Sequence, residues 1–189
     1  MTTALLIGGG RAGDAIARGL DGLSIATQRI DVDLDHRSSI PAPGLVVIPI
    51  ADAFDGASVE FSELDDSQWQ AACEIPLRRA RLALQTAHHV LRGSGGRILF
   101  IVPTSAISGD AGAVASSAVA EGVRALGKSA ALAWKAEGIS VNFLAVTAGT
   151  LRNLELLRRE VAPLVKLLAQ CGPLVTGSTL VADGGVSMI

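Results

Sequence analysis

The sequence predicts a single α/β domain, residues 1–189, built on a doubly wound and mostly parallel sheet. Short apolar runs that read as strands alternate with longer stretches of helical periodicity. That alternation is typical of a parallel sheet whose two faces are both covered by helices. The length of 189 residues suits one domain, and no internal repeat or low-complexity linker divides the chain.

The first expected elements surround a glycine-rich stretch. An apolar strand at 4–7 runs into the sequence Gly-Gly-Gly-Arg-Ala-Gly at 8–13, and a helical run follows at 15–20. A second buried strand is expected at 45–48, after proline and glycine residues that punctuate the chain. This order gives a strand, a tight turn and a helix at the start of the sheet.

The segment between these strands does not fit a complete doubly wound sheet. The runs 23–27 and 30–34 both look like strands, but only Gln28 and Arg29 separate them. Parallel neighbours need a crossover of roughly a dozen residues. Either one run is irregular, or the two form a tight antiparallel edge, and the short stretch at 35–45 suggests that this edge is shortened.

The second half is expected to hold a helix interrupted by Pro76, a strand, a long helix, a strand, a helix containing Pro163 and a last strand. Their ranges are 66–92, 98–102, 113–136, 139–146, 151–170 and 180–182.

The composition is apolar, with 49% hydrophobic and 18% charged residues. This fits either a buried sheet rich in alanine and valine or a large subunit interface. The net charge of −2 argues against nucleic-acid and acidic-membrane partners. The spacing of Cys73 and Cys171 fits neither a metal site nor a disulfide, and the adjacent His88 and His89 make a poor metal pair. No apolar run is long enough to cross a membrane. We therefore expect a cytoplasmic protein without a metal.

Gly8-x-Gly10-x-x-Gly13 follows a strand and opens a helix, which is the context of a dinucleotide-binding loop. Glycines permit a tight turn and let backbone amides approach a pyrophosphate at the positive end of a helix. Arg29 and the acidic residues after it lie in range to select between NAD and NADP. The alternative is a tight turn that binds no cofactor.

Three blocks of sequence resemble the short-chain dehydrogenase/reductase family. They are the run 96–101, the helix and strand at 122–142, and the closing block 174–185 with its Asp-Gly-Gly turn. The resemblance covers nearly the full length, is weak over the first 50 residues, and implies a Rossmann-like fold.

The family's catalytic residues do not accompany the resemblance. Aligned without a gap, the catalytic tyrosine and lysine fall on Ser116 and Ala120, and the whole chain has no tyrosine. A phenol beside a cation can act as general acid and base, whereas an unaided serine hydroxyl is too weak an acid. Lys128 lies two helical turns further on, too far to replace the lysine.

Other positions of the family's site are also changed. Pro103 takes the place of the catalytic serine, with Thr104 beside it as a substitute hydroxyl, and Pro76 takes the place of an active-site asparagine. Ile48-Pro49-Ile50-Ala51 stands where the family has Asn-Asn-Ala-Gly, and a helix from Leu151 leaves no room for a substrate lid.

The resemblance therefore implies a non-catalytic subunit of a hetero-oligomeric short-chain dehydrogenase, such as a hydroxyacyl-CoA dehydrogenase or ketoacyl reductase. The helices 66–92 and 113–136 and the last strand would contact the catalytic homologue, and a homodimer remains an alternative. No cofactor is then needed. Two other hypotheses are a dinucleotide-binding module for NAD or NADP, and an oxidoreductase that uses Thr104, Ser105 or Ser116 as a relocated hydroxyl donor.

Overall fold

The structure, a computed structural model, describes residues 3–31, 40, 42–51 and 60–187. Its centre is a six-stranded sheet in the order β2-β1-β3-β4-β5-β6, in which every pair of neighbours is parallel. The strands are β1 (Ala4–Ile7), β2 (Thr27–Ile30), β3 (Leu45–Pro49), β4 (Gly96–Pro103), β5 (Ile139–Val146) and β6 (Thr179–Val181). The predicted fold class is confirmed.

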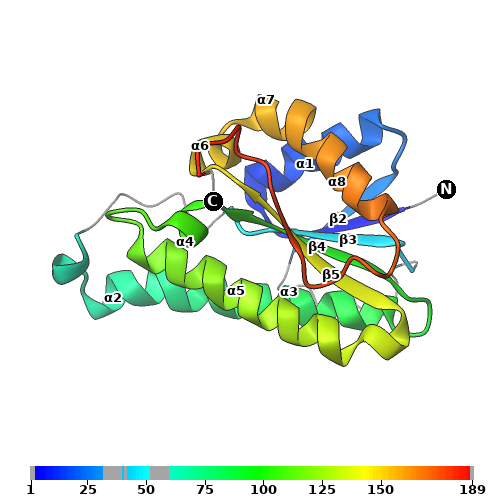
Figure 1. Ribbon diagram of the computed structural model, residues 1–189, viewed down its shortest axis with the longest axis horizontal. Helices are drawn as coiled ribbons and strands as arrows, with labels where there is room; N and C mark the ends of the chain where they lie inside the picture. The colour runs from blue at the N-terminus through cyan, green and yellow to red at the C-terminus, as the bar shows by residue number, and fades with distance from the viewer. Residues whose placement is uncertain (1–2, 32–39, 41, 52–59, 188–189) are drawn as a thin grey trace.

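Helices cover both faces of the sheet (Figure 1). They are α1 (Gly10–Gly22), α2 (Asp66–Trp69), α3 (Ile75–Leu91), α4 (Ser105–Ser108), α5 (Val114–Ala133), α6 (Ala148–Arg152), α7 (Leu154–Leu156) and α8 (Ala162–Gln170). α1 packs with α8 on one face, and α3 packs with α5 on the other. The three layers enclose one apolar core.

The central strands are apolar because both of their faces are buried. All side chains of β1, β3 and β5 are buried, and Phe100 of β4 stacks on Phe143 of β5 with ring centroids 5.7 Å apart. Such strands read as continuous hydrophobic runs and not as alternating ones. For this reason the sequence locates these strands to within a residue or two.

At the edge of the sheet, the first of the two predicted alternatives holds, because one of the two strand-like runs is irregular. β2 occupies Thr27–Ile30 and pairs in parallel with β1, so the antiparallel edge is wrong. The run 23–26 forms the turn that ends α1, where Ile25 donates a backbone hydrogen bond to Leu20 and Ser24 adopts a φ of 64°. α1 is the crossover that connects β1 to β2. β2 starts at Thr27, later than the start of the strand-like run at residue 23. The shortened edge falls largely on residues outside the described ranges.

Both internal prolines follow a widened helical turn. A π-turn at Gln70–Glu74 precedes Pro76, and another at Leu157–Val161 precedes Pro163. Proline lacks an N–H and its ring crowds the carbonyl four residues back, and a π-turn relieves both effects. The predicted helix at 66–92 therefore changes its winding at Pro76 without breaking.

The predicted single helix at 151–170 is wrong. α6 begins at Ala148 and ends at Arg152, and Asn153 then caps a new helical segment by accepting hydrogen bonds from the amides of Glu155 and Leu156. Asparagine competes with the helix for backbone donors and so favours caps. None of the helices in the described ranges is long and apolar enough to cross a membrane.

Candidate functional site

The strand order creates a crevice beside β1. The chain leaves β1 through α1 to reach β2 on one side, and β3 lies on the other side of β1. In open α/β sheets, ligands bind at such a switch point, outside the carboxyl ends of the strands. The predicted loop Gly8–Gly13 lies there, directly after β1.

Glycine is required at several positions of this loop. Gly8, Gly9 and Gly10 have φ values of 70°, 78° and 47°, in the left-handed region that glycine favours. A Cβ on Gly9 would lie 2.9 Å from Pro49. A Cβ on Gly13 would lie 2.6 Å from the carbonyl oxygen of Gly8. The first glycines thus shape the turn, and Gly13 permits close packing of α1 on β1.

Arg29 reaches from β2 across the glycine loop. Its guanidinium donates to the carbonyl oxygens of Gly8 and Gly10, at 3.4 and 3.3 Å, and forms an ion pair with Asp14 of α1. The side chain thus spans β2, the loop and the first turns of α1. Asp31, the next candidate selector, is exposed.

Two cavities open beside the loop. The smaller, of about 40 Å³, lies between the loop and the carboxyl end of β3 and has mostly apolar walls, including Pro49, Ile50 and Pro76. Pro49 occupies the space next to Gly9, where a Cβ built on the glycine would lie 2.9 Å from the proline ring.

The larger cavity, of about 330 Å³, lies over the amino end of α1. Gly9, Gly10 and Arg11 line one side of it, and Leu151 and Arg152 line the other. Both arginines are exposed, and the helix end adds the partial positive charge of its unpaired amides. These groups can hold an anion such as a phosphate.

Of the positions that the sequence resemblance assigns to catalysis, Pro76 lines the smaller cavity, whereas Pro103, Ser116 and Ala120 line neither. The side chain of Ala120 is fully buried in α5, with 0% exposure, and the hydroxyl of Ser116 donates to the carbonyl oxygen of Ala113 at 2.9 Å. Pro103 ends β4 inside the core, and Lys128 is exposed further along α5. Position 120, one helical turn after Ser116, thus offers it a buried methyl group and no charge.

The substitute hydroxyls are also placed for structure. Thr104 is 6% exposed, and its backbone joins β5 to α4 by donating to Val146 and accepting from Ile107. Ser105 opens α4, which packs against α5. Thr104, Ser105 and Ser116 lie near the ends of β4 and α5, but none of them lines either cavity.

The segment after β5 turns directly into helix. Thr147 caps α6 by accepting a hydrogen bond from the amide of Thr150 at 3.0 Å, and helical turns continue to Gln170 apart from Asn153. Residues 147–187 are all described and contain no lid over the crevice. In the described residues, helix thus follows β5 almost at once, as expected from the sequence at Leu151.

Buried polar contacts hold the last strand. The amide of Asn142 on β5 donates to the carbonyl oxygen of Val175 at 2.8 Å and accepts from the amide of Ser178 at 3.1 Å. In the following turn, hydrogen bonds from Ser187 and Gly185 hold the pKa of Asp183 below its ordinary value. These contacts fix β6 at the sheet edge.

The cysteines and histidines show no metal site. Burial raises the pKa of the Cys73 thiol, and both cysteines are free. His88 stacks on Trp134, 4.3 Å between ring centroids, and shares a 2.9 Å hydrogen bond with Glu137. No group of three metal-binding side chains forms within the described ranges.

Comparisons with known proteins point to one fold. No protein-family model matches the sequence, and no curated protein matches it. A double variant of a short-chain dehydrogenase/reductase from Serratia marcescens superposes with a TM-score of 0.76 at 20% identity, over 98% of this chain and 97% of that chain. The chain has the short-chain dehydrogenase/reductase fold.

Two further structures with this fold agree. A protein assigned as an NAD(P)-dependent gluconate 5-dehydrogenase from Beutenbergia cavernae, with NADP bound at low occupancy, matches with a TM-score of 0.75 at 19% identity, covering 97% of this chain and 96% of that one. A short-chain dehydrogenase/reductase family protein matches with a TM-score of 0.75 at 22% identity, over 100% and 98% of the two chains. Identities this low establish the fold and nothing finer.

Sequence reasoning located Gly8, Gly10 and Gly13 correctly at the crevice, but it missed Arg11 and Arg152 as a pair. These arginines are 141 residues apart (from 11 to 152), and only the sheet topology brings them together. The available signal was that both follow the carboxyl end of a parallel strand within a few residues.

Proposed function

We propose that this chain is a non-catalytic subunit that assembles with a catalytic protein of the short-chain dehydrogenase/reductase fold. The observation that carries the proposal is the fully buried Ala120, with Ser116 bonded back to its own helix. Reduction of a carbonyl requires a proton donor whose acidity suits neutral pH. Without a cation or a phenol, these positions supply none.

The second support is the apolar surface that the chain exposes. Leu132 of α5 is 80% exposed, and Leu174 and Val186, which flank β6, are 98% and 79% exposed. Exposed apolar side chains on a helix layer and beside an edge strand favour burial against another subunit. Leu132 lies on α5, one of the helices predicted for assembly, and Leu174 and Val186 lie on the segments beside the predicted last strand.

Co-expression tests the proposal. The chain and a tyrosine-containing homologue from the same source are produced together and analysed by size-exclusion chromatography with light scattering. We expect one hetero-oligomer, in which the homologue keeps its dehydrogenase activity and gains thermal stability, and no activity from this chain alone. Separate elution with unchanged activity and stability of the homologue would count against it.

The reaction of the complex follows from analogy alone. Hydroxyacyl-CoA dehydrogenases and ketoacyl reductases are the classes that the sequence resemblance suggests. A reducing compartment such as the cytoplasm suits the two free cysteines. Activity of the purified complex towards β-hydroxyacyl-CoA and ketoacyl substrates, compared with the homologue alone, decides between these classes.

A second candidate function is binding of NAD or NADP without hydride transfer. The larger cavity favours it, because Arg11, Arg152 and the amino end of α1 offer positive charge to a diphosphate. Arg29 adds a cation at the loop, although Asp14 already neutralises it. The small size of the cavity beside Pro49 disfavours it.

Titration calorimetry with NAD(H) and NADP(H) separates the two functions. If the module binds a dinucleotide, Arg152→Gln should weaken binding about tenfold, because a charged hydrogen bond to phosphate is lost. Arg18→Gln is the matched control, since Arg18 is exposed on α1 but does not line the cavity. No heat at about millimolar ligand, equivalent to binding weaker than about −4 kcal/mol, would exclude a useful module.

A further inference from the structure

The outer side of α3 carries a row of arginine, glutamine and histidine side chains. Arg78, Arg81, Gln85, His89 and Arg92 recur three or four residues apart and are all exposed. Residues at this spacing lie on one side of a helix. We call these five residues the α3 row; it spans about 21 Å at 1.5 Å per residue.

The α3 row faces away from the core. The buried residues of α3 lie on the opposite side of the helix; they are Ala80, Ala83, Leu84, Thr86, Ala87, Val90 and Leu91. Leu77, on the flank, contacts α5 near Gly122. The row is therefore on the solvent-exposed side of α3.

The arginines of the row lack acidic partners in the described part of the chain. The ion pairs found there involve Arg29, His88, Arg124, Arg158 and Arg159, and none of them involves the row. Arg81 donates to Gln85, at 3.0 Å, which leaves its charge unneutralised. Glu74 lies one turn before Arg78 and forms no ion pair with it among these contacts.

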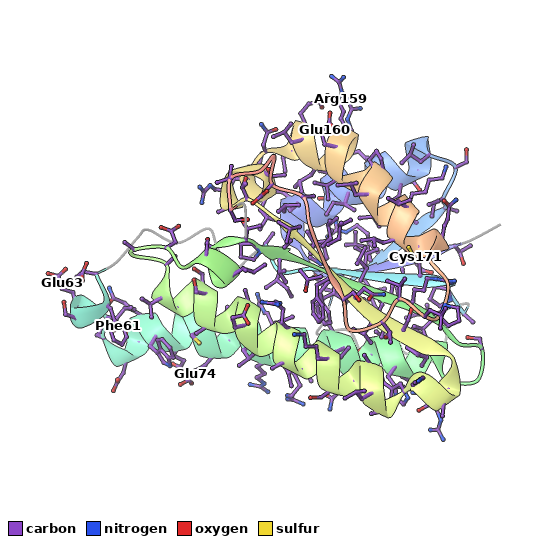
Figure 2. All side chains as sticks on the ribbon, in the orientation of Figure 1. Phe61, Glu63, Glu74, Arg159, Glu160 and Cys171 are labelled. Atoms are coloured by element: carbon purple, nitrogen blue, oxygen red, sulfur yellow. The ribbon has the colours of Figure 1, made fainter. Side chains whose placement is uncertain are left out.

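Ile75, three residues before Arg78, lies on the same side of α3, and two further apolar side chains are exposed on α5 and before α2. Ile75 of α3 is 45% exposed, Leu132 of α5 is 80% exposed, and Phe61 before α2 is 62% exposed. Figure 2 places Phe61 and Glu74 at the same end of the α2–α3 layer. A nucleic acid or another polyanion would neutralise the row but leave these side chains in water. A protein surface covers both, and the net charge of −2 adds no general attraction to polyanions.

A second copy of this chain is a poor occupant of the face. In a two-fold dimer the same patch meets itself, so α3 packed against α3 would place one α3 row against another. Like charges brought together across an interface cost free energy and suppress that pairing. The charge of this face therefore disfavours pairing with a second copy of the chain and favours a partner surface that carries carboxylates.

We propose that the outer face of α3 docks a partner subunit through a helix that bears aspartate or glutamate opposite the α3 row. The proposal rests on the proposed function, because it specifies the charge of the assembly partner. The row selects a hetero-oligomer over a homodimer, and the neighbouring apolar side chains add burial to the contact.

A charge-reversed copy of the chain serves as the acidic partner. The variant Arg78→Glu/Arg81→Glu/Arg92→Glu is mixed with wild type and studied by sedimentation velocity. We expect each protein alone to stay unpaired through α3, and the mixture to form a 1:1 complex. Its Kd should rise at least about tenfold between about 50 mM and 500 mM salt, because screening weakens exposed charge pairs.

Control variants keep the test specific. Arg18→Glu/Arg158→Glu/Arg159→Glu reverses three exposed charges on the other side of the sheet and should form no complex with wild type. The neutral variant Arg78→Gln/Arg81→Gln/Arg92→Gln should pair with wild type at least about tenfold more weakly than the reversed variant does. Thermal unfolding by circular dichroism verifies that every variant is folded.

Several results would overturn the proposal. One is a mixture that sediments as separate proteins; another is wild type that pairs with itself as tightly as the mixture does. Salt-sensitive binding of wild type, but not of the reversed variant, to a labelled DNA duplex would assign the row to nucleic acid instead.

If the catalytic homologue co-elutes with wild type and equally with the reversed variant, the proposed function stands and the row proposal fails. Pairing in the mixture without co-elution of the homologue would support the row proposal and contradict the proposed function.

Discussion

At the scale of single residues, the contact between Gly9 and Pro49 decides how the crevice is filled. Gly9 comes from the loop after β1, and Pro49 is the last residue of the neighbouring strand β3. Pro49 occupies the space that a Cβ on Gly9 would need. The glycine loop keeps its left-handed backbone, but Pro49 occupies part of the space beside it.

Gly9→Ala should destabilise the protein by about 2–3 kcal/mol, because alanine disfavours a left-handed φ and its methyl group meets Pro49. Gly22→Ala is the matched control. Gly22 ends α1, and its added Cβ would meet nothing within 4 Å. We expect it to be neutral or stabilising by up to about 1 kcal/mol. Urea unfolding measures both, and equal effects would contradict this account of the loop.

Asp183 gives a pH-dependent prediction at the same scale. Its pKa is lowered from 3.8 because Ser187 and Gly185 donate hydrogen bonds to the carboxylate. The carboxylate therefore contributes stability above pH 3.8 and loses it as the pH falls through the lower folded pKa. Nuclear magnetic resonance of the carboxyl carbon should show a midpoint below 3.8, and Ser187→Ala should raise that midpoint. An unchanged midpoint in Ser187→Ala would assign the shift to another cause.

Residue-level prediction from sequence succeeded where a residue type has one physical meaning. The glycines after β1 implied a tight turn, and the turn is there. It did not reveal that Arg29 binds the loop carbonyls, because both an ion pair with Asp14 and a ligand contact explain an arginine at the end of a strand. Only coordinates distinguish these roles.

At the scale of secondary-structure elements, two glycines of α5 lie where the helix contacts its neighbours. Gly127 lies over Phe143, and a Cβ there would be 2.5 Å from the ring. Gly122, on the same helix, faces Leu77, whose methyl group would be 3.1 Å away. The helix is thus close to the sheet at one glycine and near a flexible side chain at the other.

Gly127→Ala should destabilise the fold by about 2 kcal/mol, because the stacked Phe143 and Phe100 rings leave little room to move. Gly122→Ala should be neutral or slightly stabilising, since the gain in helix propensity is about 1 kcal/mol and Leu77 can shift. Thermal unfolding of the two variants measures the difference. A larger loss in Gly122→Ala would mean that α5 packs mainly on α3.

Strands and long helices were predictable from sequence because their burial imposes a pattern. The runs at β3, β4 and β5 are apolar on both faces, which composition alone reveals. β2 was misplaced by a few residues, because its side chains are only partly buried and leave a weak pattern. The winding changes before Pro76 and Pro163 depend on backbone geometry that no side-chain period records.

At the scale of the whole molecule, the exposed apolar residues lie on separate surfaces. Leu132 belongs to the α3–α5 layer, and Leu174 and Val186 belong to the segments that flank β6. Under the proposed function, either surface offers apolar area to a partner subunit. The α3 row gives only one of these surfaces a charge preference.

Leu174→Gln should leave the unfolding free energy of the isolated chain within about 0.5 kcal/mol of wild type, since the side chain is 98% exposed. In an assembly through the β6 edge, the same substitution should lower the oligomer fraction in light scattering. Val165→Ala is the contrast, because Val165 is fully buried and its loss should cost about 1–3 kcal/mol in folding without touching the surface. A destabilised Leu174→Gln would place Leu174 in a contact within the chain.

The buried methyl group of Ala120 limits what α5 can carry at this position. A lysine placed at position 120 would have to hold its ammonium group among side chains that exclude water, because Ala120 is fully buried. A tyrosine placed at position 116 alone would gain no charge from position 120. An engineered proton donor on this helix therefore needs more than one substitution.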